Sequence, residues 1–338
     1  MAFDAKRVLP LLLILWMTAH SSAKPAIGGA QDDRRGRNAV VVSSHSIEVG
    51  GAQLQVDFAE GPLDLPNDEI SQWIQTAAHS VTVYYGRFPV SRARILVVPV
   101  KDEKGIVQGR TWGGVHGFPG FTRMRLGEHA TAKELSEDWV MTHELVHMGF
   151  PSLPRDEHWM EEGLATYIEP IARVQAGNLE AKQIWRDMMD GMPKGEPMEN
   201  DRGLDQTHTW GRTYWGGALF CLVADVEIRK QTGNRKGLED ALRAIVAEGG
   251  TIDADWELKK ALDVGDRATG TKVLTSMYTE WSTTPVHVDL DRLWSELGVQ
   301  REGSGAAFNP KAPLAKIRES ITARGPEGIA IPSPAHLQ

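Results

Sequence analysis

The chain has almost no cysteine: Cys221 is the only one among 338 residues. An intramolecular disulfide is therefore excluded, and stability has to come from the core or from a bound metal. Cys221 lies in the apolar stretch GGALFCLVADV. That setting predicts a buried packing residue and not a nucleophile.

An excess of positive charge is also missing. There are 37 Lys and Arg residues against 45 Asp and Glu residues, and the formal net charge is −8. Binding to nucleic-acid phosphates needs a basic face, and the sequence has no nucleic-acid-binding motif. Nucleic acid is therefore not expected as a partner.

The apolar run near the N-terminus, VLPLLLILWMTA, is too short to span a membrane. It has roughly a dozen residues, against the ~20 that a spanning helix needs. Lys6 and Arg7 precede it and small residues follow it up to Ala23, the pattern of a cleaved signal peptide. We expect residues 1–23 to be a signal peptide, and the protein to be exported, periplasmic or secreted, with no membrane contact after cleavage. A retained N-terminal anchor is the alternative.

The order of local patterns predicts an α+β protein. Residues 24–40 are polar and glycine-rich and are expected to form a flexible leader. Alternating apolar residues around a Gly-Gly turn, one helical stretch and the strands ARILVVPV and GFTRMRLG predict a β-rich lobe over residues 41–130. Helical periodicity predicts a helical lobe over residues 131–302. The Gly-, Pro- and Ala-rich residues 303–338 predict a C-terminal extension that is either a weakly specified strand or loose. Strands first and helices afterwards favour α+β over alternating parallel architectures.

The strongest chemical signal is MTHELVHMGF, residues 141–150. A capping-box pattern at Thr131 and a Gly and Pro stop after residue 148 predict one helix over residues 132–148. HELVH then lies in the last turns of that helix.

His143 and His147 are four residues apart, so on a helix both imidazoles face the same way and can reach one ion. Glu144 is displaced by about 100° around the axis, where its carboxylate can take a proton from a metal-bound water. A solvated helix end is the alternative for this motif.

A catalytic zinc needs three protein ligands and an open position. The segment HWMEEGLATYIEP begins eleven residues after His147 and presents Glu161 and Glu162 on a second expected helix. A helix, a short turn and a second helix allow the second to fold back across the first. Both glutamates are candidates for the third ligand on spacing alone.

HELVH followed by WMEEGLATYIE resembles the gluzincin metallopeptidases. In that group the glutamate immediately before the glycine of an E-G pair completes the zinc site, which here is Glu162 before Gly163. The resemblance implies one Zn²⁺ per chain, bound by His143, His147 and Glu162. It also implies a thermolysin-like fold with an N-terminal mixed β-sheet lobe and a C-terminal helical lobe.

The segment TYWGGALFCLVADVEIRKQTG is similar to the third-helix segment of the glycyl aminopeptidase family within that group. The similarity implies that Tyr214 donates a hydrogen bond to the oxyanion, with a packing role as the alternative. Glu169, seven residues after Glu162, is implied to steady a zinc-bound histidine, with a solvated helix end as the alternative. Asp225 and Arg229 are four residues apart and are expected to form a structural ion pair.

One feature of the aminopeptidases is missing. No carboxylate-bearing G-x-M-E-N segment appears, and the nearest glycine-rich stretch is TWGGVHGFPG, residues 111–120. The sequence therefore does not decide between aminopeptidase and endopeptidase. His116 in that stretch, and His158 and His208, are expected to be ordinary surface residues.

These observations imply an exported zinc-dependent metallopeptidase that acts on a peptide or protein substrate. Glu144 serves as general base and Tyr214 supports the oxyanion, while GFTRMRLG is expected to hold an extended peptide as an added strand. One alternative is a catalytically silent gluzincin-like protein that binds peptides or a partner protein. Another is a metal-independent structural protein in which HELVH is accidental. Substrate preference and oligomeric state do not follow from the sequence.

Overall fold

The structure is a computed structural model that describes residues 39–324 of the chain. The expected signal peptide, nearly all of the expected leader and the end of the C-terminal extension lie outside the described residues. None of the described helices is long and apolar enough to cross a membrane.

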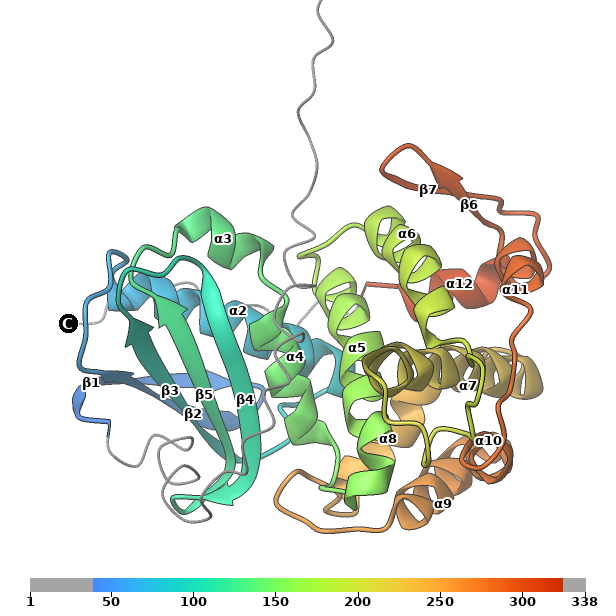
Figure 1. Ribbon diagram of the computed structural model, residues 1–338, viewed down its shortest axis with the longest axis horizontal. Coiled ribbons are helices and arrows are strands. Elements are labelled where there is room, and N and C mark those ends of the chain that lie inside the picture. The colour runs from blue at the N-terminus through green and yellow to red at the C-terminus, as the bar shows by residue number, and fades with distance from the viewer. Residues whose placement is uncertain (1–38, 325–338) are drawn as a thin grey trace, which may run out of the picture. The chain divides into compact units, whose positions relative to one another are not determined.

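Residues 41–127 of the described chain contain a five-stranded mixed sheet (Figure 1). Its strands are β1 (Val41–Val49), β2 (Ala52–Ala59), β3 (Arg92–Val100), β4 (Ile106–Val115) and β5 (Phe118–Gly127). The spatial order is β1-β2-β3-β5-β4, with β2, β3 and β5 parallel and the two outer strands antiparallel to their neighbours. The predicted hairpin is confirmed, because β1 and β2 pair around Gly50 and Gly51, which both have positive φ.

Helix α2 (Asn67–Tyr85) connects the parallel strands β2 and β3. Its residues Ile70, Ile74, Ala77 and Val81 are buried, which confirms the predicted helical spacing. The helix packs against β1 and also against α4 (Val140–Val146) and α5 (His158–Gln175). Helix α2 thus contacts both the sheet and the helices that follow it (Figure 1), while α4 also packs directly against β4.

The remaining chain is helical except for one hairpin, so the predicted sheet part followed by a helical part is confirmed. Its elements are α3 (Ala132–Glu137), α4 (Val140–Val146), η1 (His147–Gly149), η2 (Arg155–Glu157), α5 (His158–Gln175), α6 (Ala181–Gly191), η3 (Met192–Gly195), η4 (Gly211–Gly216), α7 (Gly217–Thr232), α8 (Leu238–Ala247), α9 (Leu258–Thr269), α10 (Val273–Trp281), α11 (Leu290–Leu297), β6 (Val299–Glu302), β7 (Gly305–Phe308) and α12 (Ala315–Ile321). β7 pairs with β6, and α12 buries Ile317 and Ile321. Of the two possibilities for the region from residue 303, the strand is present as β7, and the helix α12 that follows it was not predicted.

The single helix expected over residues 132–148 is broken in two. The capping box at Thr131 begins α3 as predicted, but the backbone is extended at Asp138. The Asp138 carboxylate then accepts hydrogen bonds from the N–H groups of Val140 and Met141, both at 2.9 Å. A side chain that satisfies free amides in this way starts a new helix. The histidine motif therefore lies on its own short helix, α4, and at the start of the turn η1 that follows it.

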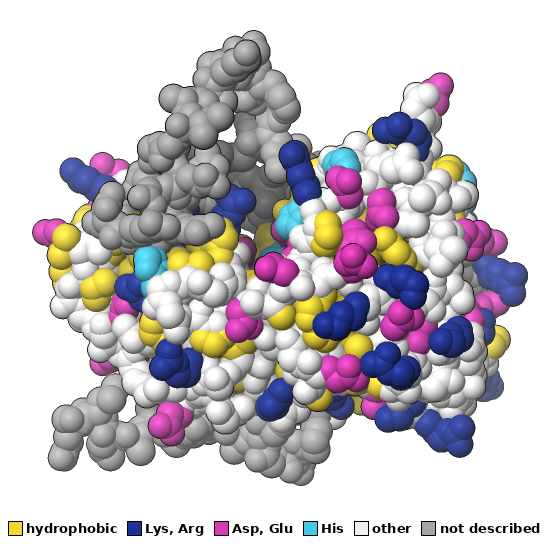
Figure 2. All heavy atoms as spheres, turned by 90° about the horizontal axis from the view of Figure 1, so that it is seen from below, with side chains coloured by type: hydrophobic (Ala, Val, Ile, Leu, Met, Phe, Trp, Pro, Cys, Tyr) yellow, Lys and Arg dark blue, Asp and Glu magenta, His cyan; other side chains and the backbone are white. Residues whose placement is uncertain are grey.

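The surface of the helical part mixes charges of both signs. On the face in Figure 2, Lys and Arg side chains alternate with Asp and Glu side chains and do not gather by sign. That face offers no basic patch of the kind that binds phosphate backbones.

Candidate metal centre

Helix α4 and the turn after it bring the two histidines together. His143 is buried in α4 and His147 begins η1, one turn later. The two rings lie 4.9 Å apart, nearly perpendicular to each other. Both Nε2 atoms face helix α5, at 3.1 Å from Glu162 Oε2 for His143 and 3.7 Å for His147.

This donor set fits a zinc ion. The three ligand atoms all lie within 4.8 Å of one another, and two imidazoles with one carboxylate are a common catalytic zinc set. Ligands at about 2.1 Å from a tetrahedral zinc lie about 3.4 Å from each other, close to the 3.1 and 3.7 Å observed. The side chains of His143, His147 and Glu162 are thus already placed for one ion.

Helix α5 packs against α4, which carries His143, and it touches α7 at two glycines beside Glu162. A Cβ on Gly163 would lie 2.3 Å from the Cα of Gly217. Only glycine at both positions allows the two backbones to approach so closely. This contact explains the glycine of the E-G pair, and it brings the start of α7 next to the metal ligand.

The same contact places Tyr214, which lies in the π-helical turn η4 directly before α7. The Tyr214 ring stacks on His143 at 6.4 Å between centroids, and its hydroxyl is within hydrogen-bonding reach of the Glu162 carboxylate. Burial and the nearby Glu162 and Glu144 carboxylates raise the pKa of Tyr214. The phenol therefore stays protonated and can donate a hydrogen bond.

Glu144 lies against strand β4. The Thr111 hydroxyl is 2.7 Å from Glu144 Oε2, and the buried Thr122 hydroxyl is 2.9 Å from the Thr111 hydroxyl. A Cβ on Gly109 would lie 2.6 Å from Glu144 Cγ, so the strand needs a glycine there. Burial raises the pKa of Glu144, although His147 and the Thr111 hydrogen bond oppose that rise.

Sequence reasoning missed Thr111 and Gly109. They share one face of β4 because side chains alternate along a strand, but nothing in the sequence says that this face meets α4. A glycine and a threonine two residues apart on a strand were the only signal.

Glu162 is an ionised carboxylate in this setting. Burial by itself would raise its pKa, but the neighbouring His147 and hydrogen bonds with two further imidazoles outweigh that effect and hold the pKa of Glu162 well below its usual range. Glu161, the competing candidate, does not reach the two histidines. It contacts His158 and the N–H of Leu153.

The other histidines that we expected to be ordinary surface residues are exposed. His116 lies in the turn after β4 with its ring edge against Phe121, and His208 faces Asp156 at 3.7 Å. His158 is exposed too, but its Nε2 is 3.3 Å from Glu162 Oε1. It therefore lies at the surface, as expected, but next to the candidate metal centre.

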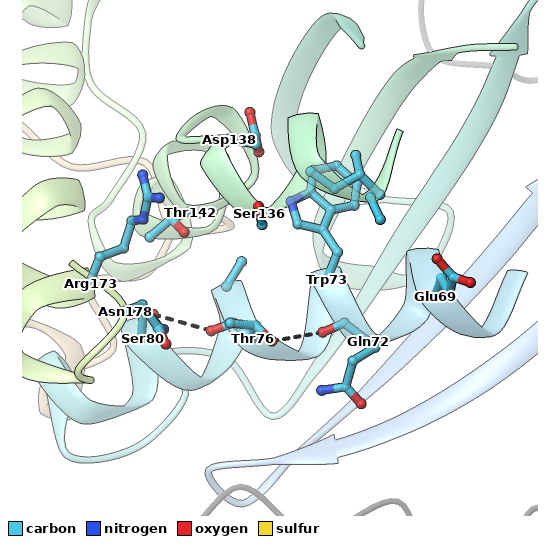
Figure 3. A pocket seen from close by; sticks show the side chains of 13 residues that line it. Glu69, Gln72, Trp73, Thr76, Ser80, Ser136, Asp138, Thr142, Arg173 and Asn178 are labelled. Atoms are coloured by element: carbon cyan, nitrogen blue, oxygen red, sulfur yellow. Dashed lines mark hydrogen bonds between the residues drawn. The ribbon is translucent and has the colours of Figure 1, made fainter. Parts of the chain in front are cut away.

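Glu169 has neither of the roles considered for it. It is buried, and its Oε1 accepts a hydrogen bond from Arg173 Nη1 at 2.8 Å. Arg173 in turn points into a cavity of about 470 Å³ between α2, α3, α4 and α5 (Figure 3). Glu169 thus supports the cavity wall and contacts no zinc-binding histidine.

Two further predictions concern packing. Cys221 is buried in α7, as predicted. Asp225 Oδ1 and Arg229 Nε form a buried ion pair at 2.8 Å, and Tyr167 donates a hydrogen bond to Asp225. The structural role predicted for this pair is confirmed.

The strand expected to hold a peptide is not available. GFTRMRLG forms β5, which pairs with β3 on one side and β4 on the other. A strand with both edges paired cannot accept another. The outer strand is β4, and within residues 39–324 no strand pairs with its other edge.

Comparisons with known proteins give a fold but no sequence relative. No family model matches the chain, and no curated protein does. The fold is similar to that of an aminopeptidase N family protein from Idiomarina loihiensis, with a TM-score of 0.55 at 11% identity over 80% of this chain and 53% of that one. An M1 zinc metallopeptidase from Deinococcus radiodurans matches with a TM-score of 0.47 at 15% identity over 73% of this chain and 52% of that one.

The chain thus spans about half the length of these solved structures. At so low an identity the likeness shows a shared fold only. The resemblance to gluzincin metallopeptidases is confirmed at that level: a sheet part followed by a helical part, arranged as in the matched half of the aminopeptidase N family protein.

Proposed function

We propose that this protein is a zinc-dependent peptidase with a thermolysin-like arrangement, which holds one zinc per chain with His143, His147 and Glu162. The observation that carries the proposal is the convergence of two imidazole nitrogens and one carboxylate oxygen within 4.8 Å, next to a buried second carboxylate. Zinc, when bound, supplies Lewis-acid polarisation of a carbonyl and an acidified water. The solved structure with the similar fold is described as an aminopeptidase N family protein, which supports the proposal.

Glu144 is the general base in this mechanism. Thr111 occupies its Oε2, so Oε1 is the oxygen left to accept a proton from the attacking water. The raised pKa of Glu144 makes it a better proton acceptor than an exposed glutamate, and it can pass the proton on to the leaving amine. Tyr214, held protonated beside His143, donates to the oxyanion.

The outer edge of β4 suits an extended peptide. Thr111 and Gly109 of this strand face Glu144, so a peptide paired along β4 would pass beside the base. Pairing through backbone groups gives affinity with little demand on side chains. This assignment replaces the peptide-binding role expected for β5.

The decisive experiment compares Glu144→Gln with Glu137→Gln. Glu137 is an exposed glutamate on α3 that pairs only with Lys133 among the described residues, so it serves as the control. Cleavage of a diverse peptide library is read by mass spectrometry with and without chelator, and zinc content is measured for each variant. We expect Glu144→Gln to keep zinc and lose hydrolysis, and Glu137→Gln to keep both.

The catalytically silent alternative makes the opposite prediction. A protein that only binds peptides would show no chelator-sensitive cleavage even as wild type. The buried, hydroxyl-bonded carboxylate of Glu144 argues against it, because a pure binding protein has no use for a base.

We also propose that the protein acts after export, in the periplasm or outside the cell. The proposal rests on the signal-peptide pattern of residues 1–23. N-terminal sequencing of the protein recovered from the exported fraction should begin at Lys24. Recovery from the cytoplasm with Met1 retained would contradict it.

A further inference from the structure

The two oxygens of Glu162 have different partners. Oε2 faces the metal side, at 3.1 Å from His143 Nε2 and 3.7 Å from His147 Nε2. Oε1 faces away from these imidazoles and lies 3.3 Å from His158 Nε2. The Glu162 carboxylate therefore contacts the two candidate zinc ligands through one oxygen and His158, which is not a candidate ligand, through the other.

His158 is itself held in place. Its Nδ1 lies 2.6 Å from Glu161 Oε2, and Glu161 Oε1 accepts a hydrogen bond from the N–H of Leu153 at 3.2 Å. A continuous chain of contacts thus runs from the backbone before α5 through Glu161 and His158 to Glu162.

The spacing on helix α5 makes this chain possible. His158 begins the helix, and residues three and four positions later lie on the same face, so Glu161 and Glu162 both come within reach of one ring. The helix start is anchored as well. Trp159 is buried, and its Nε1 donates to Asp205 at 2.7 Å.

A free carboxylate can bind a metal with one oxygen or with both, and it can rotate between the two modes. A hydrogen bond to one oxygen removes that freedom and leaves the other oxygen as the ligand. Outer partners of this kind typically contribute 10- to 100-fold in metal affinity. The His158 side chain is 51% exposed, so its effect comes from position more than from charge, which solvent screens.

We propose that His158 is a positioning residue for the metal ligand Glu162. It holds Oε1 so that Oε2 alone binds zinc, and Glu161 fixes the orientation of its ring. The inference rests on the proposed zinc centre and adds a residue that the zinc-ligand pattern does not include.

The test is zinc affinity, measured by competition with a chromogenic chelator on the full chain. The variants are His158→Ala, His158→Gln and Glu161→Gln, with His208→Ala as matched control, because His208 is 52% exposed and faces Asp156 in a similar way. We expect His158→Ala to weaken zinc binding about 10- to 100-fold, and His158→Gln and Glu161→Gln to weaken it less. His208→Ala should bind as the wild type does.

A spectrum separates positioning from a general loss of structure. With Co²⁺ in place of zinc, one-oxygen binding by Glu162 gives the intense visible bands of four-coordinate cobalt. Two-oxygen binding raises the coordination number and weakens them. We expect His158→Ala to lose band intensity at saturating Co²⁺ and His208→Ala to keep it.

The outcomes are distinct. Wild-type affinity and an unchanged cobalt spectrum in His158→Ala overturn the positioning role and leave the zinc site intact. A wild-type protein that takes up no zinc overturns both proposals. If His158→Ala does not fold, Glu161→Gln, which keeps the imidazole, decides: unchanged zinc affinity in that variant overturns the proposed chain of contacts.

Discussion

Two glutamates of helix α5, Glu162 and Glu169, have sharply different surroundings. Glu162, near its start, lies among the imidazoles of His143 and His147 with the Glu144 carboxylate close by. Glu169, two turns later, is paired with Arg173, and the Arg173 side chain lines the cavity in Figure 3. The first region gathers groups that bind cations, whereas the second pairs opposite charges.

The difference shows what a buried charge requires. On the cavity side, which is the region around Glu169, the Arg173 guanidinium compensates the negative charge of Glu169. The Asp138 carboxylate there accepts two backbone hydrogen bonds. These groups need no ligand. On the metal side, around Glu162, burial raises the pKa of Glu144, and repulsion by the Glu162 carboxylate adds to that rise. A divalent cation would relieve that repulsion, which agrees with the proposed zinc site.

The largest effect is expected on zinc content, when Glu162 is exchanged for glutamine and the same exchange at Glu169 serves as the comparison. We expect Glu162→Gln to reduce the zinc content nearly to zero, because a neutral amide is a poor zinc ligand. Glu169→Gln should keep a zinc content close to that of the wild type. Metal analysis after dialysis measures both, and equal zinc loss in the two variants would contradict the distinction.

The second largest effect is expected on stability, when a side chain is added where α5 contacts α7 beside Glu162. Gly163→Ala places a Cβ 2.3 Å from the Cα of Gly217, and neither backbone can yield. We expect a loss of about 3 kcal/mol or more in the free energy of unfolding. Gly305→Ala is the control, because its Cβ would meet only ordinary contacts of 3.7 Å or more. Similar denaturation curves for the two variants would contradict the close approach.

On the cavity side, the titration of Glu169 should make the free energy of unfolding depend on pH. Burial raises the pKa of Glu169 from 4.5 to about 7, against the opposing effect of Arg173. The folded state then holds this proton more tightly than the unfolded state does. The stabilisation by Glu169 is complete below pH 4.5 and is lost as pH rises to about 7.

We expect the difference in unfolding free energy between wild type and Glu169→Gln to change by at most about 3 kcal/mol across that range. Urea titrations at several pH values measure it. A difference that is constant with pH would show that Glu169 titrates normally.

The smallest predicted effect concerns Thr111, which holds the base on the metal side. Thr111→Val removes the hydroxyl 2.7 Å from Glu144 Oε2, and we expect kcat to fall about 10- to 100-fold with little change in KM. Thr111→Ser restores the hydroxyl and should recover most of the rate. Equal losses in both variants would point to packing and not to the hydrogen bond.

Local patterns predicted the elements that depend on near neighbours. The β1–β2 hairpin, the buried face of α2 and the capping box at Thr131 were confirmed. They follow from residues within a few positions of each other. The break at Asp138 was missed because a helix-like pattern continues through it, and only the side-chain hydrogen bonds to Val140 and Met141 show where α4 begins.

Contacts between distant segments were less predictable. The pairing of β5 on both sides, the Glu169–Arg173 pair and the approach of Thr111 to Glu144 were not predicted. Spacing puts Arg173 four residues after Glu169, but it does not say that both are buried. Strand order and helix contacts decide such questions.

By itself, the sequence determined the donor atoms: a pair of imidazoles on one face of a helix, a glutamate between them and a second glutamate before a glycine. These are local facts, because helical geometry over four residues leaves little choice. Only the tertiary structure decided which oxygen of Glu162 faces His143 and His147 and which faces His158. It also decided that Thr111 of β4 contacts Glu144. The physical reason is that packing of whole elements, such as the contact of Gly163 with Gly217, sets those distances.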